Sequence, residues 1–353
     1  MISEFFEIPA HQPRVAGTGL VALDAVLGER EGHRFWAGGS CGNVLMILSY
    51  LGWRSIPISR LDNDTAGEYV VEDMKRWGVD TSLLQLEPRA ETPIIIHQIG
   101  RSKEGIPYHR FSWTCPVCGN WFPGFKPIVL GAANTAVRLV KRSNVFYLDR
   151  VSPAAVWLAK TWSAKGALVF FEPSSVRDER LYKEALAIAD VFKYSEERGR
   201  HLAEVTASVR PTLEIQTLGP EGLRFRTSLG GYSHKRWETL DPYAIETFKD
   251  AGGAGDWCSA GLIHALAAHG RSKFRRLSRR KLLAGINFSQ ALAAWSCRFE
   301  GARGGMYALS RRAFQSQVST ILSRGQTSPP SMRMRLEDEV GVFKEVCRGC
   351  QDG

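Results

Sequence analysis

The chain of 353 residues has no apolar run of about 18 residues, the length that a membrane-spanning helix requires. This absence excludes a transmembrane helix. Residues 1–7 have neither the basic nor the apolar region of a secretory signal peptide, so we expect a cytoplasmic protein. No internal repeat is evident. With 44% hydrophobic and 23% charged residues, the composition indicates a globular protein with one large domain and an addition, or with two domains.

Cysteine is scarce as well, with seven residues in the whole chain. Four of the seven form two pairs, each with two residues between its members: Cys115, Cys118, Cys347 and Cys350. In a reducing compartment such pairs indicate metal ligands more readily than disulfides. The other three lie within apolar patterns, so we expect them to be small core residues: Cys41, Cys258 and Cys297.

The net charge of +10 favours anionic partners but does not by itself indicate nucleic acid. Seven of the eleven residues from 271 to 281 are basic. Such a run is typical of a solvated loop that leads into a helix. The alternative is contact with a polyanionic partner such as nucleic acid.

A glycine-rich turn at residues 250–255 runs directly into an amphipathic helical pattern. Glycine allows the backbone to approach a ligand and to adopt positive φ. The free N–H groups at the start of the helix, together with the helix dipole, form an anion site. Asp256 would repel a phosphate there, so we interpret it as a general base that deprotonates a hydroxyl attacking the terminal phosphate of ATP. The alternative is a plain turn with an Asp cap.

The N-terminal third contains residues suited to binding hydroxyl groups. Residues 14–24 predict one buried strand that ends in Asp24, whose carboxylate can accept two vicinal hydroxyls. Gly38 and Gly39 would let a substrate lie against the backbone, and the Asn43 amide can both donate and accept. A turn role for Asp24 and a helix-cap role for Asn43 are the alternatives.

From residue 144 onward, short apolar strands alternate with helical patterns, which predicts a parallel sheet with crossover helices. After one of these strands come Thr217, Gly219 and Gly222. A hydroxyl and two glycines at the end of a strand suit contact with a phosphate or a ribose. A simple hairpin turn is the alternative.

Three of these motifs resemble, in type, order and spacing, the signatures of the ribokinase-like (PfkB) carbohydrate and nucleoside kinases. They are Gly-Gly-x-x-x-Asn at 38–43, Thr-x-Gly-x-x-Gly at 217–222 and Gly-Ala-Gly-Asp at 253–256. The resemblance covers residues 14 to about 310. It implies an α/β fold, a three-layer α/β/α sandwich with a mainly parallel central sheet and a small β lid.

The resemblance also implies an ATP-dependent phosphotransferase that acts on an alcohol group of a sugar, a nucleoside or a related small molecule, with Mg²⁺. Asp256 is then the base, and the N–H groups that stabilise the transferring phosphoryl group are those of Gly253, Ala254 and Gly255. The substrate-binding set is Asp24, Gly38, Gly39 and Asn43. The nucleotide-binding set is Thr217, Gly219, Gly222 and Asn287. Glu197 is the weaker assignment, as a magnesium ligand.

Some positions depart from the family pattern. Ser195 and Arg198 replace an Asn and a Glu that help to organise magnesium and phosphate, and Ala251 replaces a Thr. These departures keep two alternatives open. One is a kinase-like binding protein with weakened catalysis, and the other is a zinc protein associated with nucleic acid.

We expect a kinase domain over residues 1–320, with lid strands at about 92–114 and a cysteine segment at 115–125, followed by a tail over 321–353. One structural zinc ion shared by all four paired cysteines would tie the tail to the lid. Unlinked thiols, or a zinc ion held between two chains, are the alternatives. A homodimer is one oligomeric state that the sequence leaves open.

Overall fold

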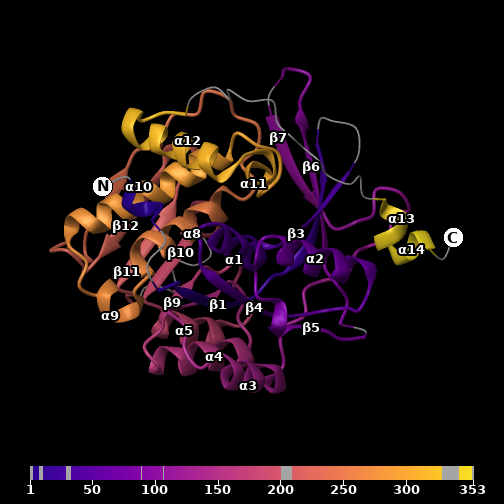
Figure 1. Cartoon of the computed structure of the whole chain (residues 1–353), viewed down its shortest axis with the longest axis horizontal. Helices are drawn as coiled ribbons and strands as arrows, with labels where there is room; N and C mark the ends of the chain where they lie inside the picture. The colour runs from indigo at the N-terminus through magenta and orange to yellow at the C-terminus, as the bar shows by residue number, and fades with distance from the viewer. Residues whose placement is uncertain are drawn as a thin grey trace.

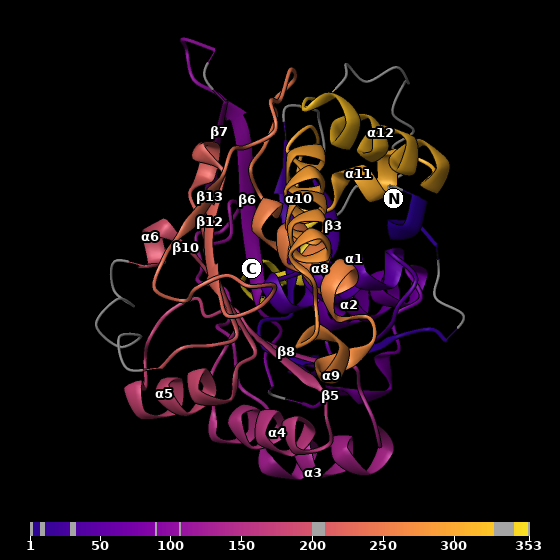
Figure 2. The same cartoon turned by 90° about the vertical axis from the view of Figure 1, so that its left-hand side faces the viewer.

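The computed structural model describes residues 3–7, 11–28, 33–88, 90–105, 107–199, 209–327 and 342–351. They form one large sheet with helices on both faces and a smaller sheet that rises from one edge (Figures 1 and 2). None of the helices in these ranges is long and apolar enough to cross a membrane.

The large sheet is mainly parallel, as predicted. Its strands, in spatial order, are β13 (Glu238–Leu240), β12 (Leu223–Thr227), β11 (Leu213–Thr217), β10 (Val191–Ser195), β9 (Leu168–Phe171), β8 (Val145–Leu148), β1 (Arg14–Thr18), β4 (Arg54–Leu61) and β5 (Leu84–Leu86). Only β12 and β13 run antiparallel to their neighbours. The central strands are short, apolar and buried on both faces, which is the pattern of a parallel sheet covered by helices.

Helices cover the two faces of this sheet and complete the three layers (Figure 2). One face carries α3 (Leu130–Leu139), α4 (Pro153–Ala164) and α5 (Glu179–Ile188). The other carries α1 (Ser40–Tyr50), α8 (Ala254–Ala267) and α10 (Arg279–Ser296), with α12 (Arg311–Arg324) packed behind them. The predicted α/β/α sandwich is confirmed.

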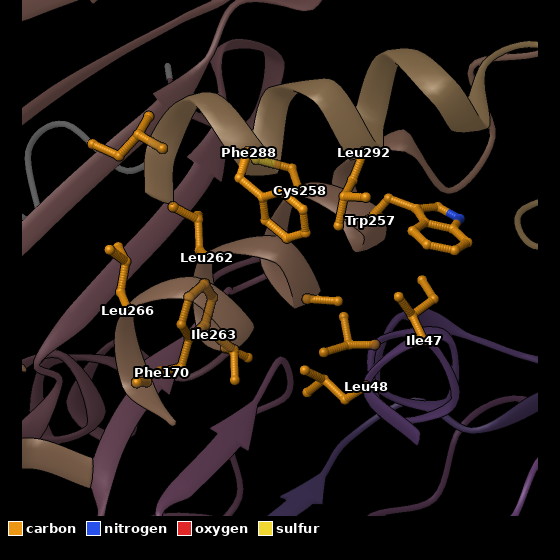
Figure 3. Close-up of a cluster of buried hydrophobic side chains, with 14 of the residues drawn as sticks. Ile47, Leu48, Phe170, Trp257, Cys258, Leu262, Ile263, Leu266, Phe288 and Leu292 are labelled. Atoms are coloured by element: carbon orange, nitrogen blue, oxygen red, sulfur yellow. The ribbon is translucent and has the colours of Figure 1, made fainter. Parts of the chain in front are cut away.

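Helix α8, which follows the glycine-rich turn, is held by the hydrophobic core on its face of the large sheet (Figure 3). Its Trp257 and Ile263 are buried against α1, α10 and the central strands. Burial of each such side chain contributes about 1.5–3 kcal/mol. A Cβ at Gly261 would lie 2.7 Å from the Cα of Ser289, so glycine is what allows α8 to pack closely on α10. This packing fixes the position of the helix N-terminus.

Several helices begin at a side-chain cap, and such caps contribute about 1 kcal/mol each. Asp64 accepts from the Gly67 N–H at the start of α2 (Thr65–Arg76), and Ser152 accepts from the Ala155 N–H at the start of α4. Ser278 caps α10 in the same way. Helix α10 therefore begins at Arg279, inside the basic run of residues 271–281.

The smaller sheet is the predicted lid, and its strand order is β3 (Arg34–Gly38), β2 (Ala22–Leu27), β6 (Ile94–Arg101) and β7 (Pro107–Ser112). The two predicted lid runs are confirmed as β6 and β7. The prediction of one continuous strand over residues 14–24 is wrong. Gly19 has φ 147°, and a Cβ there would lie 1.5 Å from the Asp149 carboxylate. The chain therefore turns after β1, and Asp24 lies inside lid strand β2.

The remaining elements are short: η1 (Ser3–Phe5), η2 (Thr81–Leu83), α6 (Glu196–Gly199), η3 (Gly219–Glu221), α9 (Gly270–Phe274), α11 (Gly304–Ala308), α13 (Phe343–Val346) and α14 (Arg348–Gln351). Helix α12 crosses the domain boundary predicted at residue 320 and buries Phe314 and Ile321 in the core. Residues 328–341 of the predicted tail lie outside the described residues. The last two helices lie beside the lid and α2 (Figure 1).

Candidate active site

The glycine-rich turn ends at Gly253, which caps α8 with φ 79° and ψ −5°. A Cβ at this position would lie 2.5 Å from the Cα of Ala302, so both the conformation and the space require glycine. The N–H groups of Gly253 and Gly255 have no hydrogen-bond partner within the described part of the chain. The Ala254 N–H, in contrast, donates to the Ala251 carbonyl at 3.1 Å. Two of the three predicted anion-binding donors are thus free in this structure.

Asp250 holds the turn in place. Its carboxylate accepts from the Gly252 N–H at 2.7 Å, from the Gly301 N–H at 2.8 Å and from His109 Nδ1 of lid strand β7 at 2.6 Å. Burial alone would raise the pKa of Asp250, but these hydrogen bonds lower it and keep the group ionised. The sequence reasoning did not find this role, which links the turn to the lid.

Asp256 lies in the first turn of α8, beside the free N–H groups. It is partly exposed at the surface of the site, although protein atoms surround its carboxylate closely. Burial and the nearby charge of Glu172 raise its pKa to about 8, while a hydrogen bond from Asn43 Nδ2 at 2.9 Å opposes this effect. A carboxylate with a pKa near neutrality is suited to accepting a proton.

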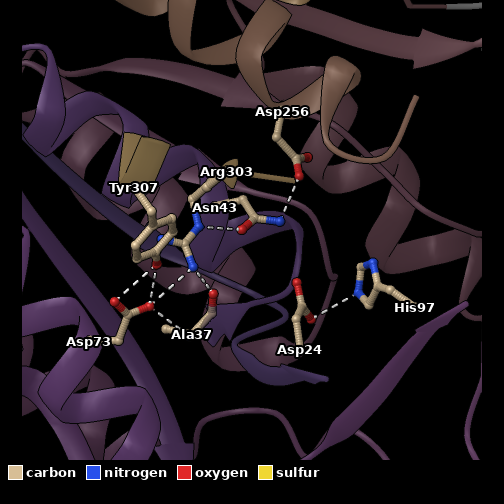
Figure 4. Close-up of polar contacts among 8 residues, drawn as sticks. All are labelled: Asp24, Ala37, Asn43, Asp73, His97, Asp256, Arg303 and Tyr307. Carbon is tan, nitrogen blue, oxygen red and sulfur yellow. Dashed lines mark hydrogen bonds and ion pairs between the residues drawn. The ribbon is translucent and has the colours of Figure 1, made fainter. Parts of the chain in front are cut away.

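Two of the predicted substrate residues, Asp24 and Asn43, lie near Asp256 (Figure 4). Asp24 is buried on β2, with its Oδ1 3.3 Å from His97 Nε2 of β6. A Cβ at Gly38 would lie 1.9 Å from the Asp24 carboxyl carbon, so glycine leaves room for that side chain. Apart from this ion pair, Asp24 Oδ1 and both ring nitrogens of His97 have no hydrogen-bond partner within the described residues. Buried polar atoms of this kind are suited to a hydroxylated ligand.

A buried ion pair lies beneath the turn. Lys193 Nζ on β10 is 2.5 Å from Glu172 Oε1 and 3.1 Å from the Gly255 carbonyl. Ser259 and Tyr147 donate to the other Glu172 oxygen at 2.5 and 3.1 Å. Sequence reasoning assigned no function to this pair. The available signal was a lysine inside an apolar strand, because charge at such a position is seldom buried unless it is paired.

A cavity of about 820 Å³ adjoins the turn and contains three of the four predicted nucleotide-binding residues: Thr217, Gly219 and Gly222. Asn287, the fourth, is not among its lining residues. The residues of the same helix that line the cavity are Gln290, Ala293 and Ala294, three to seven residues after Asn287. Glu197 lines the cavity beside Glu196, at the end of β10. Ala254 and Gly255 also line it, so this cavity and the base share one turn.

The four paired cysteines meet at the outer edge of the lid. All four Sγ atoms lie within 4.8 Å of one another, with Cys115 and Cys350 at 3.6 Å and Cys118 and Cys347 at 3.6 Å. Tetrahedral zinc with Zn–S bonds of about 2.3 Å places sulfur atoms about 3.8 Å apart, so the cluster fits this ion. A hydrogen bond from the Asn120 N–H lowers the pKa of Cys118 to about 7.

Three of the seven basic residues at 271–281 have structural contacts. Arg271 and Arg275 pair with the buried Asp190 at 2.8 and 3.2 Å, and Arg279 donates to the Tyr232 hydroxyl at 3.0 Å. Other basic residues of the run line a second cavity of about 910 Å³ beside the N-terminal segment, together with Glu4 and Glu7. This cavity does not include the residues around Asp256.

No model of a known protein family matches this chain. The chain is similar to a protein of Pyrococcus horikoshii that is named a sugar kinase, with 24% identity over 277 residues, 73% of this chain and 82% of that protein. It is also 25% identical over 286 residues to the ATP-dependent ribose-1-phosphate kinase of Halopiger xanaduensis, covering 79% of this chain and 86% of the relative.

Among solved structures, the Pyrococcus protein superposes with a TM-score of 0.63 at 22% identity, covering 82% of this chain and 93% of that one. A nucleoside kinase of Burkholderia thailandensis, solved with inosine, also superposes with a TM-score of 0.63, at 16% identity over 89% of this chain and 98% of that one. The relatives, the shared fold and the assembled motifs together indicate the ribokinase-like (PfkB) kinase family.

Proposed function

We propose that this protein transfers the γ-phosphoryl group of ATP to an alcohol group of a sugar, a nucleoside or a related small molecule. The observation that carries the proposal is the position of Asp256. Its carboxylate lies in the first turn of α8, directly after a glycine turn with free N–H groups, between the 820 Å³ cavity and the buried Asp24 side chain.

In the proposed reaction, Asp256 accepts the proton of the attacking hydroxyl, which makes the oxygen a better nucleophile as it approaches the phosphorus. The N–H groups of Gly253 and Gly255 donate to the phosphoryl oxygens as negative charge develops there. The Ala254 N–H joins them only if it releases the Ala251 carbonyl.

The two substrates occupy opposite sides of the turn in this proposal. Asp24 and Asn43 bind the hydroxyls of the acceptor, with Gly38 and Gly39 leaving room along the backbone. ATP occupies the cavity lined by Thr217, Gly219 and Gly222, which leaves the adenine near Gln290 rather than Asn287. Glu197, with Glu196 beside it, offers carboxylate oxygens that suit Mg²⁺, which neutralises triphosphate charge when bound.

The cysteine cluster is proposed to hold one structural zinc ion. Four thiolates would leave no open coordination position for water, so the metal would have no catalytic role. Its effect would be mechanical. Arg348, which lies between the cysteines of the second pair, contacts Asp62 just before α2. Phe343 packs on Phe35 of the lid. The tail would therefore connect the lid to the start of α2.

The decisive experiment measures ATP turnover with a panel of sugars and nucleosides. ADP release reports the turnover, and the phosphorylated product is identified. We expect one substrate class to give saturable, acceptor-dependent ADP release. A chain that binds ATP and panel members but never forms a phosphorylated product would instead be the weakened, kinase-like binding protein.

A further inference from the structure

Arg303 is an arginine at the start of α11 that is only 2% exposed. Its guanidinium lies where four elements meet (Figure 4). Nε donates to Asn43 Oδ1 of α1 at 2.9 Å, and the terminal nitrogens donate to the Ala37 carbonyl of β3, to the Tyr307 hydroxyl at 2.7 Å and to Asp73 of α2 at 3.3 Å. A buried charge with so many partners is held in one orientation.

The direction of each hydrogen bond follows from chemistry. A guanidinium has only donors, so the group of Asn43 that faces Arg303 must be its carbonyl oxygen. The Nδ2 amide nitrogen then faces Asp256, and it lies 2.9 Å from Oδ2. Without the arginine only the Asp256 carboxylate would select this orientation, and a protonated Asp256 could donate to the oxygen of a rotated amide instead.

We propose that Arg303 is a positioning residue for the catalytic base: it fixes the Asn43 amide so that its NH₂ group holds the Asp256 carboxylate in place and favours its ionised form. A hydrogen bond donated to the charged form of an acid stabilises that form. The inference rests on the proposed role of Asp256 as the base.

Asp73 and Tyr307 support this arrangement from behind. Asp73 accepts from the Tyr307 hydroxyl at 2.7 Å and from the Ala37 N–H of lid strand β3 at 2.8 Å. The tyrosine ring stacks on Trp36 at 4.4 Å. The orientation of the amide is thus tied to the strand that leads into Gly38 and Gly39. Other charged groups also act on Asp256, namely Glu172 after β9, Lys193 on β10 and Arg198 on α6.

The test is a pH titration of Asp256 in Arg303→Lys, with NMR of ¹³C-labelled aspartate as the readout. The Asp256 signal is assigned by its absence from the spectrum of Asp256→Asn. Lysine keeps a positive charge opposite Asp73, so the fold is retained, but it has no Nε group to bond Asn43. We expect the Asp256 midpoint to rise by about one pH unit. Tyr307→Phe, which removes one partner of Arg303 but keeps its Nε bond to Asn43, is the matched control and should move the midpoint much less than Arg303→Lys does.

A second comparison shows whether the effect passes through the amide. In an Asn43→Ala background, Arg303→Lys should no longer move the midpoint. An unchanged midpoint in Arg303→Lys, or an equal rise with and without Asn43, would overturn the positioning role. This readout does not need turnover. Failure of the proposed function would appear instead as absence of any phosphorylated product from the unaltered chain.

Discussion

The candidate active site and the cysteine cluster are both assembled from distant parts of the chain, but their surroundings differ. Around Asp256, charged groups are enclosed between the sheet and the helices, and pairs such as Glu172 with Lys193 neutralise one another. The cysteines lie at the rim of the lid, where Cys118 is exposed and Cys347 is only 2% exposed. At the first site burial raises the pKa of Asp256, whereas at the second the C-terminal segment packs against the lid and α2. Substitutions should therefore change chemistry at the first and attachment at the second.

The largest effect is expected from Asp256→Asn. The amide is nearly isosteric but cannot accept the proton, so turnover should fall by about 10²–10⁴-fold while ATP and acceptor binding remain. Rapid-quench assays and equilibrium binding of each substrate measure the two properties separately. Near-normal kcat in this variant would remove Asp256 from the mechanism.

The titration of the same residue should change activity and stability in opposite directions as the pH changes. Because burial and Glu172 raise the pKa of Asp256 to about 8, kcat/KM should decrease roughly tenfold per pH unit below that value. A carboxyl group with a raised folded-state pKa stabilises the fold fully below its unfolded value of 3.8, and this contribution is lost as pH rises through about 8.

Activity and this part of the stability should therefore change in opposite directions between pH 5 and 8. The checks are kcat/KM profiles and urea unfolding at several pH values, with Asp256→Asn as the reference that lacks both dependences. A flat kcat/KM profile between pH 6 and 8 would contradict the assignment.

A smaller effect is expected from Asp24→Ala. A buried hydroxyl pair left without its acceptor costs about 1–3 kcal/mol, so KM for a polyhydroxylated acceptor should rise about 5- to 150-fold. ATP affinity should be almost unchanged, because Asp24 is absent from the residues that line the 820 Å³ cavity. Steady-state kinetics with each substrate varied in turn make the comparison. An equal loss of ATP affinity would place Asp24 in the wrong site.

The smallest effect on turnover is expected at the cysteine cluster. The double variant Cys347→Ser, Cys350→Ser should lose the zinc ion and weaken acceptor binding more than ATP binding, because the tail contacts the lid and α2. Arg348→Ala, between the two cysteines, keeps all four thiols and should keep the metal. Metal analysis of purified protein decides the point. Zinc well below one ion per unaltered chain, or full zinc in the serine variant, would exclude a shared site.

Much of the fold was predictable because its signals are local. Apolar strands such as Val145–Leu148, separated by helical patterns, require a parallel sheet covered on both faces. The turn that ends at Gly253 was predictable for the same reason, since a residue with left-handed backbone conformation directly before a helix is usually glycine. The error at Gly19 arose because nothing local shows that Asp149 occupies the neighbouring space and that the chain must turn there.

By itself, the sequence determined the family motifs, the sheet with its helices, the choice of Asp256 as the proposed base and the two cysteine pairs. Only the tertiary structure decided which side chains surround the base. Asn43 and Arg303 are 260 residues apart in the chain, and Lys193 on strand β10 contacts Gly255 at the start of α8. Their pairing depends on how α8 packs against its neighbours. The pKa of Asp256 and the orientation of the Asn43 amide are therefore properties of the packed molecule, because both follow from burial and from charges that no short stretch of chain contains.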